Sequence, residues 1–342
     1  MSRSSPVIWA LIDDRPGTAN QVLGLAEAVG QPFIIKELKY TPAAKIPNIF
    51  RGTKILGIDK ATLNELKEPW PDWVIAAGRR SAPVARWIKK QTGGMAKLVQ
   101  LMDPGPPRRD FYLIAIPEHD KTPGLRALEL NNNLFRHDKK CDHPLTSKIV
   151  YTTGSPHRLT PAKLNEACAQ WQKQFGHLPK PHIALLVGGS SKKNNLSSAL
   201  AAQLLERVQE MAKEAGGSLL VTTSRRTPSK IIKALQKGLK VPHYFYDWHS
   251  GGENPYQGIL ACADYIVATG DSMSMCSEAC ATGKPVYIYA PGVIASDKHK
   301  RLHQSLFKRK LAQAFGGNFQ PYTYEPPNVA RDLAERLFPP LP

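Results

Sequence analysis

The sequence predicts two α/β domains, each built on a doubly wound, Rossmann-like parallel sheet, and three observations support that prediction. The chain has 342 residues, which is too long for one ordinary core and suits two domains of about 150 residues each. In both halves, short apolar segments alternate with amphipathic helical patterns, which is typical of parallel strands covered on both faces. A polar stretch at 134–147 separates the two halves.

The individual strands and helices follow from this alternation. The predicted strands of the first half are 7–12, 33–38, 73–77, 97–101 and 111–116, and its clearest helices are 20–29 and 82–91. The predicted strands of the second half are 182–187, 218–222, 243–246, 265–268 and 286–289, and its helices are 196–215, 229–237, 256–263 and 274–282. A last helical pattern, flanked by prolines, occupies 329–338.

These elements define an N-terminal domain over 1–145, a C-terminal domain over 146–322 and a tail over 323–342. The helix of the tail is expected to pack back toward the N-terminal domain. The polar stretch at 134–147 is the best linker candidate. Its two histidines and one cysteine have a spacing that matches no common metal site, so no metal is expected there.

Net charge narrows the class of ligand more than the rest of the composition does. Lys and Arg number 46 against 28 Asp and Glu, which gives a formal charge of +18. Such a surplus attracts nucleic acids, anionic lipid headgroups or phosphorylated small molecules. No recognisable nucleic-acid-binding module accompanies the charge, so a nucleic-acid partner is not expected. An anionic membrane surface stays open as a partner.

Cysteine usage and the first residues favour the cytoplasm. Five cysteines are an odd number and form no C-x-x-C pair, which argues against a disulfide framework or a cysteine-based zinc site. No apolar run approaches the ~18 residues that span a bilayer. The apolar segment 6–12 runs directly into Asp13 and Asp14, so it predicts a buried strand rather than a signal peptide. Peripheral contact with the inner face of the cytoplasmic membrane is the open alternative.

In open α/β sheets, ligands sit at the carboxyl ends of the strands, and several strand ends of the first half carry polar side chains. After the first strand, Asp13 or Asp14 is a candidate general base and Thr18 a candidate helix N-cap. The alternative is that Asp14 and Thr18 only shape a turn. After the third strand, Arg79 and Arg80 form a candidate anion site next to a capping Ser81.

The fifth strand is followed by His119 and Asp120, which are the residue types of a general base and of the acid that orients it. Neither G-x-G-x-x-G nor G-x-x-x-x-G-K-[ST] occurs in the sequence. A dinucleotide site and a P-loop therefore lose their main support.

Two loops of the second half have the composition of a phosphate site. The first places two glycines and two serines between a strand and a helix, an arrangement that cradles a diphosphate. The second is a basic, hydroxyl-rich turn after the next strand. We expect the first loop to cradle the diphosphate through Gly188, Gly189, Ser190 and Ser191. The second loop, which carries Arg225 and Arg226, is expected to converge on the same edge of the sheet.

The most specific segment is 263–285. A predicted strand runs into Thr269-Gly-Asp-Ser, and the helix that follows carries Ser274 in its first turn and Glu278 one turn later. A helix N-terminus takes a phosphate on its free N–H groups, and a carboxylate one turn on accepts both hydroxyls of a ribose. The alternative is an amphipathic helix with a solvated glutamate.

Two sets of motifs resemble known proteins. Asp271-Ser-x-Ser-Met-x-Ser-Glu-Ala-x-Ala-x-Gly-x-Pro285 resembles the donor-nucleotide helix of GT-B glycosyltransferases. A wider set resembles the elongated-mitochondria family of mitochondrial fission proteins and its bacterial relatives over nearly the whole chain. Its motifs are Arg15-Pro-Gly-Thr-x-x-Gln21, Gly78-Arg-Arg, Pro117-Glu-His-Asp120, Thr153-Gly-Ser-Pro-His157, Gly188-Gly-Ser-Ser, Asn254-Pro-Tyr and Asp271-Ser-x-Ser-Met275.

The resemblance implies a GT-B fold, in which two Rossmann-like domains face each other across a cleft. It also implies an enzyme that moves a sugar from a nucleotide-diphosphate donor to an acceptor such as an envelope lipid or glycan. Neither a metal nor a cofactor other than this donor substrate is expected. Two alternatives stay open: a nucleotide-sugar 2-epimerase, and a non-enzymatic, membrane-associated scaffold.

Residue roles are implied by the same resemblance. Glu278 would hold the donor ribose, and the first domain would hold the acceptor. The general base would be one of Asp14, His119 and Asp120. The remaining donor-binding residues would be Gly188, Gly189, Ser190, Ser191, Arg225, Arg226, Asp271, Ser272, Ser274 and Met275.

Overall fold

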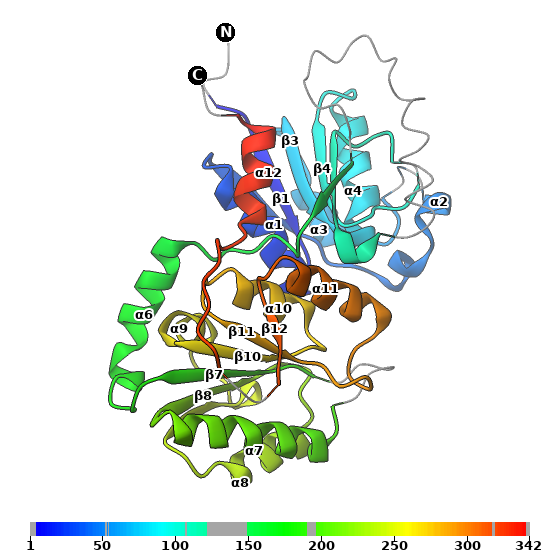
Figure 1. Cartoon of the computed structure of the whole chain (residues 1–342). Coiled ribbons are helices and arrows are strands. Elements are labelled where there is room, and N and C mark those ends of the chain that lie inside the picture. The colour runs from blue at the N-terminus through cyan, green and yellow to red at the C-terminus, as the bar shows by residue number, and fades with distance from the viewer. Residues whose placement is uncertain are drawn as a thin grey trace. The chain divides into compact units, whose positions relative to one another are not determined.

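The computed structural model describes residues 5–51, 53, 55–106, 108–121, 149–189, 196–316 and 319–339. The chain divides into two compact units, and each carries a parallel six-stranded sheet (Figure 1). The first unit comprises Met1–Arg158 and Asn328–Pro342, and the second comprises Leu159–Pro327.

In the first unit the strand order is β2-β1-β3-β4-β5-β6. All residues of β3 and β5 are buried, as expected for parallel strands covered on both faces. The bounds are β1 Ile8–Ile12, β2 Phe33–Glu37, β3 Trp73–Ala77, β4 Lys97–Leu101, β5 Leu113–Pro117 and β6 Ile149–Thr152.

The helices of the first unit include the last helix of the chain. α12 (Val329–Leu337) packs against α1 (Pro16–Ala28), and Leu333 and Leu337 join the same core cluster as Leu25. α4 (Gly78–Gln91) contributes to the core cluster on the other side. The short elements are η1 Pro42–Lys45, α2 Asn48–Arg51, α3 Lys60–Glu65 and η2 Glu118–Asp120.

The first unit differs from the sequence-based expectation at its end and at two helix starts. β6 pairs with β5, so the unit ends at Arg158 rather than at residue 145. The helix α1 begins at Pro16 with Arg15 as its N-cap, because proline favours the first helical position. Thr18 therefore lies inside the helix and is not its cap. The predicted linker at 134–147 lies outside the described residues.

The start of α4 also differs from the prediction. This helix begins at Gly78, four residues earlier than expected. Ser81 therefore lies within the first turn, where its hydroxyl donates to the carbonyl oxygen of Ala77 at 2.7 Å. Ser81 does not cap the helix, and the Arg79–Arg80 pair is helical rather than part of a loop.

In the second unit the strand order is β12-β11-β10-β7-β8-β9. All six residues of β7 are buried, as are those of β8. Burying each Leu, Ile or Val side chain of such strands stabilises the fold by about 1.5–3 kcal/mol. The bounds are β7 His182–Val187, β8 Ser218–Thr223, β9 His243–Tyr246, β10 Tyr265–Thr269, β11 Val286–Tyr289 and β12 Gln313–Ala314.

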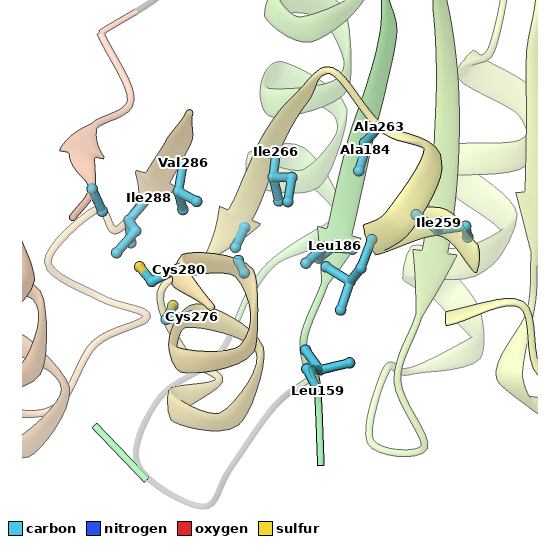
Figure 2. Packing of buried hydrophobic residues seen from close by; sticks show 14 of the residues in the cluster. Leu159, Ala184, Leu186, Ile259, Ala263, Ile266, Cys276, Cys280, Val286 and Ile288 are labelled. Atoms are coloured by element: carbon cyan, nitrogen blue, oxygen red, sulfur yellow. The ribbon is translucent and has the colours of Figure 1, made fainter. Parts of the chain in front are cut away.

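Helices cover both faces of this second sheet. One face packs against four helices: α6 (Pro161–Phe175), α9 (Tyr256–Cys262), α10 (Met273–Cys280) and α11 (Asp297–Lys308). Figure 2 shows residues of this cluster, with Ile266 of β10 and Leu186 of β7 on the sheet and Cys276 on α10. The other face packs against α7 Ser198–Glu214 and α8 Ser229–Gly238.

The helices α6 and α11 were not predicted from the sequence. In α11, the apolar pattern is masked by basic and polar residues, since only Leu302, His303 and Leu306 of its twelve residues are buried. A helix with so narrow an apolar stripe gives a weak periodic signal.

Strand order determines where each sheet can bind a ligand. Successive strands are added to the sheet in opposite directions on the two sides of a switch point, which lies between β7 and β10 in the second sheet and between β1 and β3 in the first. Adjacent loops diverge at such switch points and leave a crevice at the carboxyl ends of the strands, where open α/β sheets bind ligands.

Candidate functional site

The loops after β7 and β10 meet at the switch point of the second sheet. The backbone N–H of Gly188 donates to Thr269 Oγ1 at 2.7 Å. The next N–H, from Gly189, donates to Asp271 Oδ2 at 2.6 Å. These two bonds hold the ends of the neighbouring strands together, so the geometry of one loop depends on the other.

The two glycines are required by close packing. A Cβ atom on Gly188 would lie 2.4 Å from Asp271 Oδ2, and one on Gly189 would lie 2.3 Å from the carbonyl carbon of Arg226. The loop after β8 is fixed to the same place, because Thr227 Oγ1 donates to the carbonyl oxygen of Gly188 at 2.5 Å. Three strand ends therefore converge on one turn.

The helix α10 begins at this turn. Its N-cap is Ser272, whose hydroxyl oxygen accepts from the N–H of Met275 at 3.5 Å. The N–H groups of Met273 and Ser274 have no intrahelical acceptor, as in the first turn of any helix. Ser274 is exposed and Met275 half-buried. The helix thus presents donor groups at the carboxyl edge of the sheet.

Asp271 is the buried acid of the turn. It is 5% exposed, and burial raises its pKa, against the lowering effect of the hydrogen bonds from Thr269 and from backbone N–H groups. Its Oδ1 has no hydrogen-bond partner among the described residues. Because Oδ2 already holds Gly189, the side chain of Asp271 acts as a positioning group for the turn.

Glu278 lies one turn into α10 and is half-buried. The Tyr256 hydroxyl, at the start of α9, donates to Glu278 Oε2 at 2.7 Å. Burial raises the pKa of Glu278 to about 7, although the bond from Tyr256 opposes the shift. The carboxylate is therefore oriented by Tyr256 and keeps Oε1 for another donor.

This raised pKa predicts a pH dependence of stability. Between about pH 5 and pH 7 the folded protein keeps a proton on Glu278 that the unfolded chain releases, since the ordinary pKa is 4.5. This contribution is complete below the unfolded pKa and is lost as pH rises through the folded pKa. Relative to wild type, Glu278→Gln should gain up to about 3 kcal/mol of unfolding free energy from pH 5 to pH 8. Urea unfolding at several pH values measures this, and parallel pH profiles for the two proteins would contradict it.

The candidate acids of the first unit lie at its own switch point. A hollow of about 390 Å³ between the ends of β1, β3, β4 and β5 includes Asp13, Asp120 and Arg79 in its lining. A second hollow of about 460 Å³ includes Asp13 and Asp14. His119 is buried, at 3% exposed, and lines neither hollow.

Asp13 is better enclosed than the predicted Asp14. The Asp14 side chain is 77% exposed and that of Asp13 is 6% exposed, and each accepts from Arg80 Nη2 at 2.7 Å. The hydrogen bond from Arg80 lowers the pKa of Asp14, which makes that carboxylate a weak base while the ion pair is intact. Sequence spacing alone could not rank these adjacent acids, because they differ in burial although both bind Arg80 at the same distance.

The two arginines of the predicted anion site in this unit, Arg79 and Arg80, have different environments. Arg80 is engaged by the two aspartates, and its guanidinium stacks over the Tyr40 ring at 4.5 Å. Arg79 is exposed and lines the smaller hollow. Asn48 fixes its backbone by donating to the carbonyl oxygen of Arg79 at 2.8 Å.

The structure thus brings most predicted donor-site residues of the second unit to one turn. The backbone of Arg226 packs against Gly189, and both Arg225 and Arg226 are exposed. Ser190 and Ser191 lie outside the described residues. Sequence reasoning did not assign a role to Tyr256 or Thr227, although the Asn254-Pro-Tyr motif contained the first of them.

No group of three His, Cys, Asp or Glu side chains in the described ranges is arranged to hold a metal ion. Among the helices of the described residues, none is both long and apolar enough to cross a membrane.

The protein consists of two Rossmann-like units, and in the second the loops after β7 and β10 meet at the switch point of the sheet. This is the architecture of the GT-B fold. Solved UDP-GlcNAc 2-epimerases share this fold. The Methanocaldococcus jannaschii structure has a TM-score of 0.53 at 14% identity and covers 97% of this chain and 98% of that one. The Neisseria meningitidis structure, bound to UDP-GlcNAc, has a TM-score of 0.50 at 13% identity and covers 97% and 99%.

The chain belongs to the mitochondrial fission ELM1 family, whose sequence profile matches residues 16–339. It is 31% identical to protein RP120 of Rickettsia prowazekii over 344 aligned positions, covering 96% of each chain. It is 30% identical to the mitochondrial fission protein ELM1 of Arabidopsis thaliana, covering 83% of this chain and 67% of the plant protein.

Proposed function

We propose that this protein binds a nucleotide-diphosphate sugar at the switch point of its second sheet and transfers the sugar to an acceptor held by the first unit. One arrangement carries the proposal: the Gly188–Gly189 turn is bonded to the residues that begin α10, and Glu278 follows one turn later on the same helix, held by Tyr256. A nucleoside diphosphate has complementary groups. Its anionic diphosphate suits the N–H donors of the turn and helix, and the two hydroxyl donors of its ribose suit the carboxylate.

The diphosphate would lie at the glycine turn and the first turn of α10. Backbone N–H groups at a helix N-terminus attract anions through hydrogen bonds and the helix dipole. The Ser272 hydroxyl uses its oxygen as the cap and keeps its own hydrogen to donate to a phosphate oxygen. Arg226, whose backbone abuts Gly189, supplies positive charge nearby.

The ribose would lie against Glu278. A carboxylate held by Tyr256 at 2.7 Å has a defined orientation, so less ordering is needed when the nucleotide binds. Burial strengthens each hydrogen bond to an ionised carboxylate, to about 1.5–3 kcal/mol. Nucleotide affinity should accordingly be higher above pH 7, where Glu278 is ionised.

In the proposed reaction, the residues around the diphosphate stabilise the leaving group. As the bond from the anomeric carbon to the diphosphate breaks, negative charge grows on the phosphate oxygens, and donors already aimed at that place stabilise the transition state. An acceptor hydroxyl in the first unit must lose a proton. Asp13, Asp14 and Asp120 are three of the acids that line the two hollows there, beside Asp103 and Glu37.

Calorimetry with UDP, GDP and ADP, followed by their sugar conjugates, tests the binding step. Each conjugate that binds is then incubated alone and with envelope lipid or glycan extracts, and the products are followed by NMR. A transferase leaves the sugar donor unchanged alone and consumes it when an acceptor is present. An epimer or a glycal formed from donor alone would instead establish the 2-epimerase. Binding without turnover would favour a scaffold, and no binding of any nucleotide would overturn the proposal.

A further inference from the structure

Two cysteines face each other where α6 packs against α9. Cys168 lies on α6 and Cys262 ends α9, and their Sγ atoms are 2.8 Å apart. The two helices run side by side on one face of the second sheet (Figure 1). Their approach is close, because a Cβ on Gly258 would lie 2.4 Å from the Trp171 ring.

The distance between the two Sγ atoms is only slightly longer than a disulfide bond. A disulfide has an S–S length of about 2.05 Å, so closing the gap requires a movement of less than about 1 Å. The two residues are 94 positions apart in the sequence, so the fold, and not local spacing, brings the thiols together. That is why the absence of a C-x-x-C motif gave no hint of the pair.

The surroundings provide access and positive charge. Cys168 is half-buried and Cys262 buried, so a reagent from solvent meets Cys168 first. Burial and the adjacent Cys168 raise the pKa of Cys262 to about 12, and the positive charges of Lys284 and Lys180 offset only part of this rise. The Lys284 ammonium is held in place by the carbonyl oxygen of Ala261. Partial exposure, which Cys168 has, is a feature of reactive thiols.

The other described cysteines lack this setting. Cys276 and Cys280, which lie on α10 (Figure 2), are fully buried. Their thiols face backbone carbonyl oxygens, of Thr269 at 3.9 Å and of Leu311 at 3.5 Å respectively. Such cysteines behave as small apolar side chains.

We propose that Cys168 and Cys262 are a thiol–disulfide pair that is oxidised by a small disulfide such as oxidised glutathione. The Cys168 thiolate attacks one sulfur of the oxidant, and the other sulfur leaves as a thiolate. The Cys262 thiolate then attacks Cys168 Sγ and expels the second thiolate. The protein loses two protons and two electrons, and the oxidant is reduced to two thiols. This inference is independent of the proposed nucleotide site.

The test uses the full chain with Cys141→Ser, since Cys141 lies outside the described residues and is a competing thiol. Of the five cysteines, four then remain. After incubation with oxidised glutathione, we expect two titratable thiols in denaturant instead of four, and peptide mapping should recover a Cys168–Cys262 cross-link. The midpoint of thermal unfolding should be higher for the oxidised protein than after reduction with dithiothreitol.

Two variants identify the order of events. With Cys262→Ala, Cys168 should retain one glutathione as a stable mixed disulfide. With Cys168→Ser, all remaining thiols should survive the treatment. Four titratable thiols in the Cys141→Ser protein would overturn the proposal, as would a mixed disulfide on Cys168 that persists while Cys262 is present. A cross-link to Cys276 or Cys280, or between two chains, would also overturn it.

Discussion

Replacing Glu278 by alanine is expected to weaken nucleoside-diphosphate binding at least tenfold while the protein stays folded. Tenfold corresponds to about 1.4 kcal/mol, which is less than the loss expected for hydrogen bonds from two ribose hydroxyls to a desolvated carboxylate. Removing a half-buried acid whose pKa is raised by burial also removes a desolvation cost, so the folded state should survive. Calorimetry gives the dissociation constant, and thermal unfolding checks the fold.

Matched controls separate a ribose contact from a general loss of structure. Glu210→Ala removes an exposed acid on α7 and should leave the dissociation constant unchanged. Tyr256→Phe removes the bond to Glu278 but keeps the carboxylate, so its effect should be smaller. The decisive comparison uses a 2′-deoxynucleoside diphosphate. Wild type should bind it more weakly than the ribonucleotide, and Glu278→Ala should bind the two alike. Unchanged discrimination in the variant would remove Glu278 from the ribose site.

The second large effect is expected from Gly189→Ala. The added Cβ would lie 2.3 Å from the Arg226 carbonyl carbon and 2.4 Å from its oxygen, and a backbone atom cannot rotate away as a side chain can. The loop after β7 or β8 must shift, at a cost of about 1–3 kcal/mol typical of overpacking. Urea unfolding measures that loss.

Nucleotide binding should fall in Gly189→Ala by more than the stability loss alone explains. The shift breaks the bond from the Gly189 N–H to Asp271 and moves the proposed diphosphate cradle. Gly292→Ala is the matched control, because its added Cβ would have no heavy atom of the described residues within 4 Å, apart from those of its chain neighbours. Equal stability and equal nucleotide affinity for Gly189→Ala and Gly292→Ala would show that the close approach at β7 has no energetic consequence.

The fold was largely predictable because parallel strands buried on both faces are continuous apolar runs. β7 and β10 were found nearly to the residue for that reason. β6 was missed because it is only partly buried at the sheet edge, and the two halves therefore seemed to divide earlier than they do. Helix starts were predicted late where proline or glycine replaces a side-chain cap, as in α1 and α4.

The candidate site could be predicted only as far as local sequence determines it. The turn that begins α10 and the position of Glu278 follow from spacing along one helix. The partners of these groups do not. Tyr256 is 22 positions from Glu278, and Arg80 is 67 positions from Asp13. Such pairings depend on strand order, which one sequence does not disclose.

The position of α12 has a consequence for how the protein is made. The apolar face of this helix completes the core over α1. In the sequence, however, α12 is the last helix described and α1 is the first. During synthesis on the ribosome, the unit that emerges first is also the unit that is finished last. Residues 5–158 alone would leave Val22, Leu25 and their neighbours without the cover of Leu333 and Leu337. The second unit is continuous in sequence, so its core can be completed without a segment from elsewhere in the chain.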